Sequence, residues 1–452
     1  MERITNRLGQ ADLGDAARRG FVLLALMQIA FGMALTAQQN IVVNYFNDVL
    51  KFSTPEFGYI TAIREIPGFL IIFLSAVVYR VSLQRVTAGA LVLLGVAYMC
   101  FGLSNSFWTV VPWVVLSSIG YHTVLQTQNA LALNLTGEKK SGAILGWMSG
   151  MNQTGSLIGL VMILVTFAAG ILGFRSAFVV LGIVSILGAV AVFGFPHLHD
   201  GVEQQVAAKR DPVVLKRDYR FYYWLSLIDG ARQQIFFSFG LMVLVKFYGL
   251  TVEQVSALLI VVTLAAALLG PTIGRLIDTQ GERRLLSWVN VAYIVALGGY
   301  AFTSNVFVAS ACYIIYTFIS PLSAMAASTY LRKIATPADI APSFAMGTTM
   351  QHAAAIVVPL STGFILNYVG YQVPFMIACV FAFVAIVVTQ GLNPSAQRSA
   401  ERIALDARSA AAPGAEGEAL EIASMETANA DDPGSHLSAN LAAATLADKS
   451  AD

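Results

Sequence analysis

Charged residues are scarce in this sequence, and their scarcity argues against an ordinary soluble domain. Only 12% of the 452 residues are Asp, Glu, Lys or Arg, whereas soluble domains carry about 25%. The formal net charge of +1 provides no basic surface for nucleic acid, so we expect no nucleic-acid partner. Hydrophobic residues make up 57% of the chain instead, which is typical of a protein that spends most of its length in a lipid bilayer.

Cysteine and the motifs of several enzyme classes are also missing or rare. The three cysteines, Cys100, Cys312 and Cys379, lie far apart inside apolar stretches, which indicates neither a disulfide framework nor a metal site. The sequence has no G-x-x-x-x-G-K-[ST] phosphate loop, no G-x-S-x-G elbow and no H-E-x-x-H pair. We therefore expect no enzyme, no metal and no cofactor. The remaining functional class is transport driven by an existing gradient.

Long apolar runs fill most of the chain. About 20 apolar residues cross a bilayer as a helix, and none of the runs alternates as a barrel strand does. We predict an all-α membrane protein with twelve transmembrane helices. The predicted spans are residues 21–46, 56–79, 84–104, 108–134, 141–168, 174–195, 221–247, 254–276, 285–303, 307–331, 343–367 and 372–391.

The basic residues predict the orientation of these spans. Loops on one side hold most of the Lys and Arg, and only Lys51, Arg175 and Lys246 fall on the other side. Cytoplasmic loops carry the excess of basic residues. We therefore expect a multi-pass protein of the cytoplasmic (inner) membrane with both termini in the cytoplasm.

The two halves of the chain repeat each other. The tripeptides AQQ at 37–39 and RQQ at 232–234 lie the same distance before a Lys-Phe pair, and a Thr-x-Glu follows each pair. An even number of spans in each half makes this a parallel repeat. We predict two six-helix bundles, residues 21–195 and 221–391.

The segments outside the bundles are different in composition. We predict a cytoplasmic N-terminus at 1–20 and a cytoplasmic linker at 196–220. Residues 392–452 are rich in Ala, Ser, Gly and acidic residues and almost free of aromatics. Such a segment buries too little apolar surface to fold alone. We expect a disordered acidic tail, with a partner-binding tail as the alternative.

One loop carries a recognisable motif, GRLIDTQGERRLL, between the eighth and ninth spans. A helical glycine lets a neighbouring helix approach, an Asp suits a helix N-terminus, and the arginines anchor the loop at the cytoplasmic surface. This stretch resembles the loop signature of the major facilitator superfamily, which joins the second and third helix of each half. The residues that carry the resemblance are Gly274, Asp278, Gly281, Arg283 and Arg284.

The resemblance is incomplete at three positions. The family prefers a basic and then an aromatic residue where Thr279 and Gln280 stand, and Arg where Glu282 stands. The resemblance implies a secondary transporter whose two halves rock relative to each other in an alternating-access cycle. It also implies a gating role for the motif residues and for the charges that lie within the spans, Arg64 and Arg232.

Charges inside spans are costly and usually functional. Asp229 and Arg232 in the seventh span are three residues apart, so they share a helix face and are expected to neutralise each other. Arg64 and Glu65 in the second span diverge by about 100°, so we expect them to find separate partners. The alternative is that all four charges are structural and hold the halves together.

Glu65 is the predicted proton-coupling residue, because a buried carboxylate without a close cation favours its protonated form. By resemblance, the family's second and eleventh helices face each other, which places His352 opposite Glu65, either to receive the proton or to stabilise the ionised carboxylate. Asp229 is the second candidate for proton coupling.

Amide side chains recur in several spans. By resemblance, the first, fourth, seventh and tenth helices line a central cavity. The predicted substrate-binding residues are therefore Gln38, Gln39, Gln126, Asn129, Gln233, Gln234 and Tyr316. Buried amides also hold helices together, and this alternative remains open for each of them.

The predicted function is secondary active transport of a small solute, coupled to protons, by a monomer. Two arginines and many amides favour an organic anion or a polar metabolite. Many aromatics and 13 Met would suit a lipophilic drug, so drug efflux is the alternative, although the fifth span lacks the Gly-Pro of the exporter signature. A third hypothesis is a transporter-like sensor or scaffold that acts through the 392–452 tail.

Overall fold

A computed structural model describes residues 15–78, 81–133, 135, 141–196, 215–394, 396–398 and 402–403. The side chains of 15–17, 71–78, 141–143, 269–280, 337 and 341 are outside this description. Regular structure in the described ranges is helical, without strands. Our predictions for most of the N-terminus, most of the linker and the tail beyond 403 concern residues that are not described.

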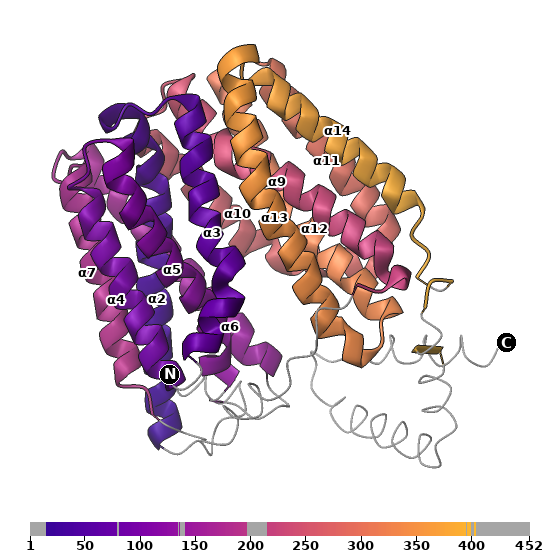
Figure 1. Ribbon diagram of the computed structural model, residues 1–452, viewed down its shortest axis with the longest axis horizontal. Helices are drawn as coiled ribbons and strands as arrows, with labels where there is room; N and C mark the ends of the chain where they lie inside the picture. The colour runs from indigo at the N-terminus through magenta and orange to yellow at the C-terminus, as the bar shows by residue number, and fades with distance from the viewer. Residues whose placement is uncertain are drawn as a thin grey trace, which may run out of the picture.

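Twelve long helices correspond to the twelve predicted spans (Figure 1). The first half contains α2 (Asp15–Asn44), continued by η1 (Tyr45–Val49), then α3 (Thr54–Val78), α4 (Leu83–Phe101), α5 (Phe107–Leu133), α6 (Ser141–Ala168) and α7 (Phe174–Phe193). The second half contains η3 (Arg217–Tyr219), α9 (Arg220–Lys246), α10 (Val252–Gln280), α11 (Glu282–Phe302), α12 (Val306–Ile334), α13 (Pro337–Val369) and α14 (Gln372–Gln390). In the described part of the chain, nine helices are long and apolar enough to cross a membrane.

The helix ends follow local sequence chemistry. Thr251 begins α10 with a capping box: its Oγ1 accepts from the Gln254 backbone N–H, and its own N–H donates to Gln254 Oε1 at 3.0 Å. Asn305 caps α12 by accepting from the backbone N–H of Phe307 at 2.8 Å. Gly281 separates α10 from α11 with φ of +72°, a conformation that favours glycine.

The packing of the helices confirms the parallel repeat. In the first half, α2 packs against α6 and α7, and α4 packs against α5 and α7. The second half repeats these pairs, with α9 against α13 and α14, and α11 against α12 and α14. The two bundles lie side by side (Figure 1) and meet where α3 packs against α13 and α6 against α10. These two cross-bundle pairs are also equivalent under the repeat.

One end of the seam between the bundles is held together by hydrogen bonds. At this end, where α2 finishes and α3 begins, Asn44 Nδ2 donates to the Leu250 carbonyl at 2.9 Å. Lys246 Nζ donates across the seam to the Phe52 carbonyl at 2.5 Å, and Thr54 bonds to Asn367 at 3.3 Å. We call this region the closed end.

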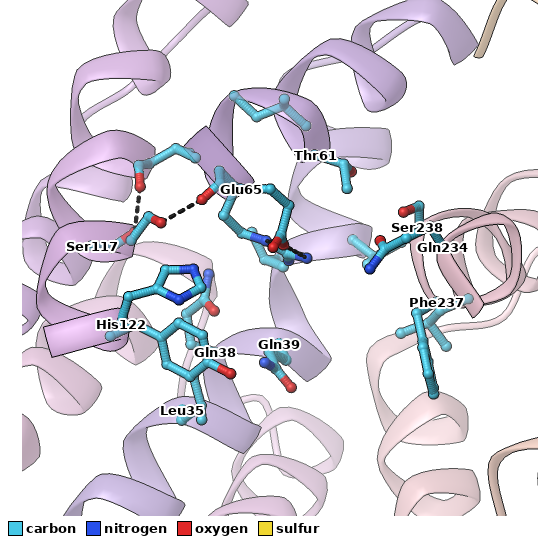
Figure 2. A pocket seen from close by; sticks show the side chains of 18 of the residues that line it. Leu35, Gln38, Gln39, Thr61, Glu65, Ser117, His122, Gln234, Phe237 and Ser238 are labelled. Atoms are coloured by element: carbon cyan, nitrogen blue, oxygen red, sulfur yellow. Dashed lines mark hydrogen bonds and ion pairs between the residues drawn. The ribbon is translucent and has the colours of Figure 1, made fainter. Parts of the chain in front are cut away.

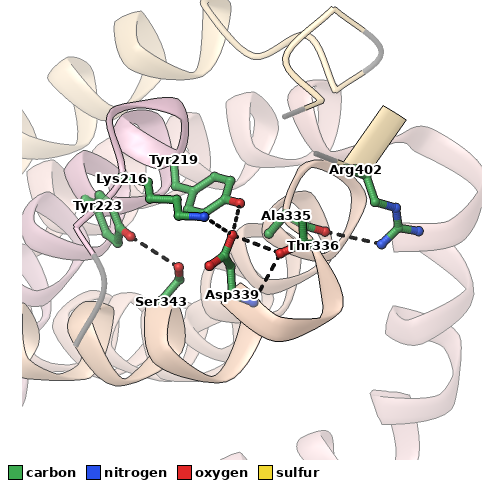
Figure 3. A network of polar contacts seen from close by, with 8 residues as sticks. All are labelled: Lys216, Tyr219, Tyr223, Ala335, Thr336, Asp339, Ser343 and Arg402. Atoms are coloured by element: carbon green, nitrogen blue, oxygen red, sulfur yellow. Dashed lines mark hydrogen bonds and ion pairs between the residues drawn. The ribbon is translucent and has the colours of Figure 1, made fainter. Parts of the chain in front are cut away.

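A polar network at the opposite end joins segments that lie far apart in the sequence (Figure 3). Asp339 in the first turn of α13 accepts from Lys216 Nζ at 2.7 Å and from Tyr219 Oη at 2.7 Å. Arg402 Nη1 donates to the carbonyl of Ala335 at 3.2 Å. The end of the linker therefore binds the first turn of α13, and the start of the tail binds Ala335 just before that helix.

Candidate functional site

A cavity of 570 Å³ lies between the two bundles. Helices α2, α3, α4 and α5 of the first half and α9, α10, α12 and α13 of the second contribute to its lining. Small-molecule sites typically have volumes of about 300–1,000 Å³. The cavity is therefore large enough to enclose a metabolite.

Amides and hydroxyls give the cavity its polar surface. Four of the predicted amides line it, namely Gln38, Gln39, Gln126 and Gln234. Figure 2 shows Gln234 and Ser238 on α9 facing the side of the cavity formed by Thr61 and Glu65 on α3. Donors and acceptors from both bundles therefore reach one volume, which allows a single solute to contact both halves.

The other three predicted binding residues are not part of the lining. Asn129 is exposed elsewhere on α5. Gln233 points into its own bundle, where Nε2 donates to Asp229 Oδ2 at 2.9 Å. Tyr316 is fully buried, with its ring stacked on Phe236 at a centroid distance of 3.7 Å. The contacts of Gln233 and Tyr316 are those of helix packing.

Four titratable side chains gather on the cavity wall, and we call them the charge cluster: Arg64, Glu65, His122 and His352. The Glu65 side chain is 12% exposed, and its Oε1 lies 3.1 Å from Arg64 Nη2. Its Oε2 lies 3.7 Å from Nδ1 of His352, on the opposite bundle. The His122 and His352 rings are 5.6 Å apart between centroids. The carboxylate thus has a cation on one side and an imidazole on the other.

The pairing of Arg64 with Glu65 corrects the expectation that these neighbours would find separate partners. The Cβ directions of adjacent helical residues diverge by about 100°, but the long arginine side chain bends back toward Glu65. The Arg64 side chain remains 47% exposed to the cavity. The predicted approach of His352 to Glu65 is present. His122, which was not among the predicted site residues, belongs to the charge cluster and lies one turn from Gln126 on α5.

The second pair of charges lies within the C-terminal bundle. Arg232 forms the predicted ion pair with Asp229 through Nη2. Arg232 is 0% exposed, and its guanidinium lies 3.3 Å from the centroid of the Tyr293 ring, a cation–π contact that helps to compensate burial of the charge. Neither charge lines the 570 Å³ cavity. This geometry is that of a charge pair that supports the bundle.

The motif between α10 and α11 is only partly described. Gly274 and Asp278 lie in α10, where side chains are outside the description. Gly281 makes the turn, Arg283 Nη2 donates to Gln390 Oε1 of α14 at 3.0 Å, and Arg284 is exposed. The gating roles expected for these residues therefore remain predictions.

Comparison with known proteins identifies the fold and the family. The chain matches the family model described as Major Facilitator Superfamily over residues 24–243 and 223–413. No curated protein shows a significant match. The fold is similar to that of the nucleoside transporter NupG, with 15% identity, 85% of this chain and 99% of that chain covered, and a TM-score of 0.64.

Two other solved structures share the fold. One is a bacterial homolog of the human lysosomal transporter Spinster in an inward-facing, occupied conformation, with 14% identity, coverage of 86% and 99%, and a TM-score of 0.66. The other is a D-xylose–proton symporter, with 14% identity, coverage of 85% and 100%, and a TM-score of 0.67. Since the family model matches most of the chain, the protein is a transporter that belongs to the Major Facilitator Superfamily.

Proposed function

We propose that this transporter moves a small organic anion or polar metabolite together with protons by alternating access, with Glu65 as the proton-coupling residue. The charge cluster is the observation that carries this proposal. It combines a carboxylate, an arginine and two histidines on the wall of a cavity lined by both bundles. Charged side chains at membrane depth are costly and mark ion and substrate pathways.

Protonation of Glu65 links the proton to the seam between the bundles. When ionised, Glu65 attracts Arg64 at 3.1 Å and faces His352 at 3.7 Å. A proton on the carboxylate removes its charge and weakens both attractions. Because His352 belongs to the other bundle, the contact between the halves depends on the protonation state.

The same proton changes the charge that the cavity presents to a solute. Arg64 is paired with Glu65 while the carboxylate is ionised. Once Glu65 is protonated, the half-exposed guanidinium is free to bind a carboxylate or phosphate on the solute, which arginine does with two parallel hydrogen bonds. An anion and a proton would then occupy the site together, which favours symport of the two.

Orientation in the membrane follows from the basic loops. The loops around the closed end carry few Lys and Arg, so we place this end outside and both termini in the cytoplasm. The conformation described here would then be sealed toward the outside. Transport requires the bonds of the closed end, including Lys246 to Phe52, to break and reform in each cycle.

The lining also bears on the choice of solute. Tyr98, Tyr121 and Phe237 add aromatic surface, which suits a ring-containing solute. The four amides and the charge cluster favour a polar solute over a lipophilic drug, because an apolar solute would leave their hydrogen bonds unmade. Solved transporters of the same fold include ones named for nucleosides and for D-xylose, which are polar.

Reconstitution tests the proposal. The purified protein in proteoliposomes is screened with radiolabelled organic acids, nucleosides and sugars, with and without an imposed pH gradient. For the transported solute, Glu65→Gln is expected to abolish accumulation driven by the pH gradient and to retain exchange of internal for external solute. The control is Glu56→Gln on the same helix, whose carboxylate lies outside the cavity lining and accepts from the Ser53 backbone N–H at 2.7 Å.

Accumulation against a gradient by the Glu65→Gln protein, with only a pH difference imposed, would remove Glu65 as the coupling residue. The scaffold hypothesis is tested by truncation after Ile403, which keeps the described contacts of the tail. Unchanged transport by the truncated protein supports a transporter whose tail is dispensable.

A further inference from the structure

A second concave surface lies at the opposite end of the C-terminal bundle from the closed end. It is a groove of 680 Å³ formed by the first turns of α11 and the last turn of α14 with the residues that follow it. Arg283, Arg284 and Trp288 on α11 and Gln390 on α14 line it. This groove shares no residue with the cavity between the bundles.

The groove carries positive charge that no described acidic side chain neutralises. Glu282 lies beside the arginines, but it is 4% exposed and its carboxylate is bound by Lys333 at 2.6 Å. Arg283 donates to Gln390, and Gln390 Nε2 donates to Ser287 Oγ at 3.0 Å, so neutral partners hold Arg283 in place. Among the side chains that the structure describes, neither Arg283 nor Arg284 has an ion-pair partner.

An exposed apolar stripe begins at the groove and runs along the bundle. On α11, Trp288 is 64% exposed, and Val291 and Val295 follow on the same face at i+3 and i+7. On α14, which packs against α11 (Figure 1), Val387 and Val380 are also exposed. From Arg284 to Val295 the helix rises about 16 Å at 1.5 Å per residue, close to the roughly 15 Å of one leaflet's hydrocarbon.

We propose that this groove binds an anionic phospholipid. The phosphate lies against Arg283 and Arg284, which offer planar donors suited to phosphate oxygens. Trp288 lies at the boundary between headgroup and chain, where tryptophan is enriched. One acyl chain follows the stripe formed by α11 and α14. Basic pockets between helices at the membrane surface bind acidic headgroups in this way, whereas a soluble phosphate would use the arginines and leave the stripe without a partner.

The experiment measures lipid binding by the full-length protein in detergent. Dioleoyl phosphatidylglycerol is titrated in, with dioleoyl phosphatidylcholine and glycerol 3-phosphate in parallel, and the melting temperature gives each apparent affinity. The wild type is expected to be stabilised by phosphatidylglycerol alone. Each interfacial cation contributes about 5-fold to affinity for acidic lipid, so Arg283→Gln/Arg284→Gln is expected to bind roughly 30-fold more weakly.

The control removes the same charge from the start of α2. Arg18 and Arg19 are exposed neighbours outside the groove, so Arg18→Gln/Arg19→Gln is expected to keep the wild-type response. The Arg284 side chain makes no described hydrogen bond, so the single variant Arg284→Gln provides a second test if the double variant is unstable. An equal response of the groove and control variants overturns the proposal. The proposal is also overturned if glycerol 3-phosphate stabilises the protein as much as phosphatidylglycerol does. The groove would then bind the phosphate alone, without the acyl chains.

Discussion

Gly58 on α3 provides a direct test of how the closed end holds the bundles together. A Cβ added at Gly58 would lie well inside 3.0 Å of the Pro359 carbonyl oxygen and 3.3 Å from Gly363 Cα, both on α13. Backbone atoms cannot rotate out of the way. Gly58→Ala must therefore push α3 and α13 apart, and we expect it to weaken the closed end relative to conformations in which these helices separate.

The size of the effect follows from the cost of overpacking. Adding a methyl group to a well-packed contact costs typically about 1–3 kcal/mol. At about 1.4 kcal/mol for each factor of ten, the ratio of closed to open molecules should fall by roughly 5- to 140-fold. Alanine also favours helix over glycine by up to about 1 kcal/mol, which requires a control with the same substitution. Gly150→Ala on α6 is that control, because no atom lies within 4 Å of its added Cβ.

Distance measurements between spin labels report the shift. Labels on Ser53→Cys and Tyr368→Cys flank the closed end on opposite bundles, in a background without the three native cysteines. We expect a longer distance to gain population in the Gly58→Ala protein and to stay rare in the Gly150→Ala protein. Identical distance distributions in the two variants would refute the reasoning, because they would show that the contact between α3 and α13 does not limit opening.

Three further predictions concern the remaining polar residues. Gln234→Ala should weaken apparent solute affinity about 2- to 13-fold, which is the value of one hydrogen bond of roughly 0.5–1.5 kcal/mol. Gln233→Ala should instead lower the melting temperature and leave solute affinity unchanged, and the reverse pattern would contradict the roles assigned to these two residues. Asp229→Asn leaves the buried Arg232 guanidinium without its counter-charge, so unfolding measurements should show a loss of about 3–5 kcal/mol, and a melting temperature equal to wild type argues against a structural pair. Asp278→Asn should slow transport with expression and folding intact, and a normal initial rate would end the motif's proposed gating role.

The prediction of the spans rested on a local property of the sequence. A helix in lipid must satisfy its own backbone hydrogen bonds and cover its backbone with about 20 apolar side chains. Nine helices in the described ranges meet this condition by their own length and composition, without reference to any other segment. The repeat could be recognised for the same reason, since the matching tripeptides and Lys-Phe pairs are patterns along the sequence and do not depend on the packing of the helices. The Asp229–Arg232 pair was predictable because helix geometry alone brings i and i+3 together.

The site depended on tertiary structure to a greater degree. Gln233 and Gln234 are neighbours of the same type, yet one bonds to Asp229 inside the bundle and the other lines the cavity. Their directions differ by about 100°, and only the packing of α9 against α13 and α14 decides which one faces the seam. Arg64 reaches Glu65 through one of several staggered rotamers. The spacing of the two residues in the sequence does not indicate which rotamer the arginine adopts.

Contacts between distant segments were decided by the tertiary structure alone. Lys333 at the end of α12 pairs with Glu282 at the start of α11, and Lys216 before α9 pairs with Asp339, which lies beyond four intervening helices along the chain. Such pairs lie in loops and helix ends whose composition is ordinary, so no pattern in the sequence marks them. The choice of segments that enter the membrane follows from the amino-acid sequence, because burial in lipid acts on each segment separately. The arrangement of polar side chains around the cavity was decided only when the helices packed, because each contact there joins residues far apart in the chain.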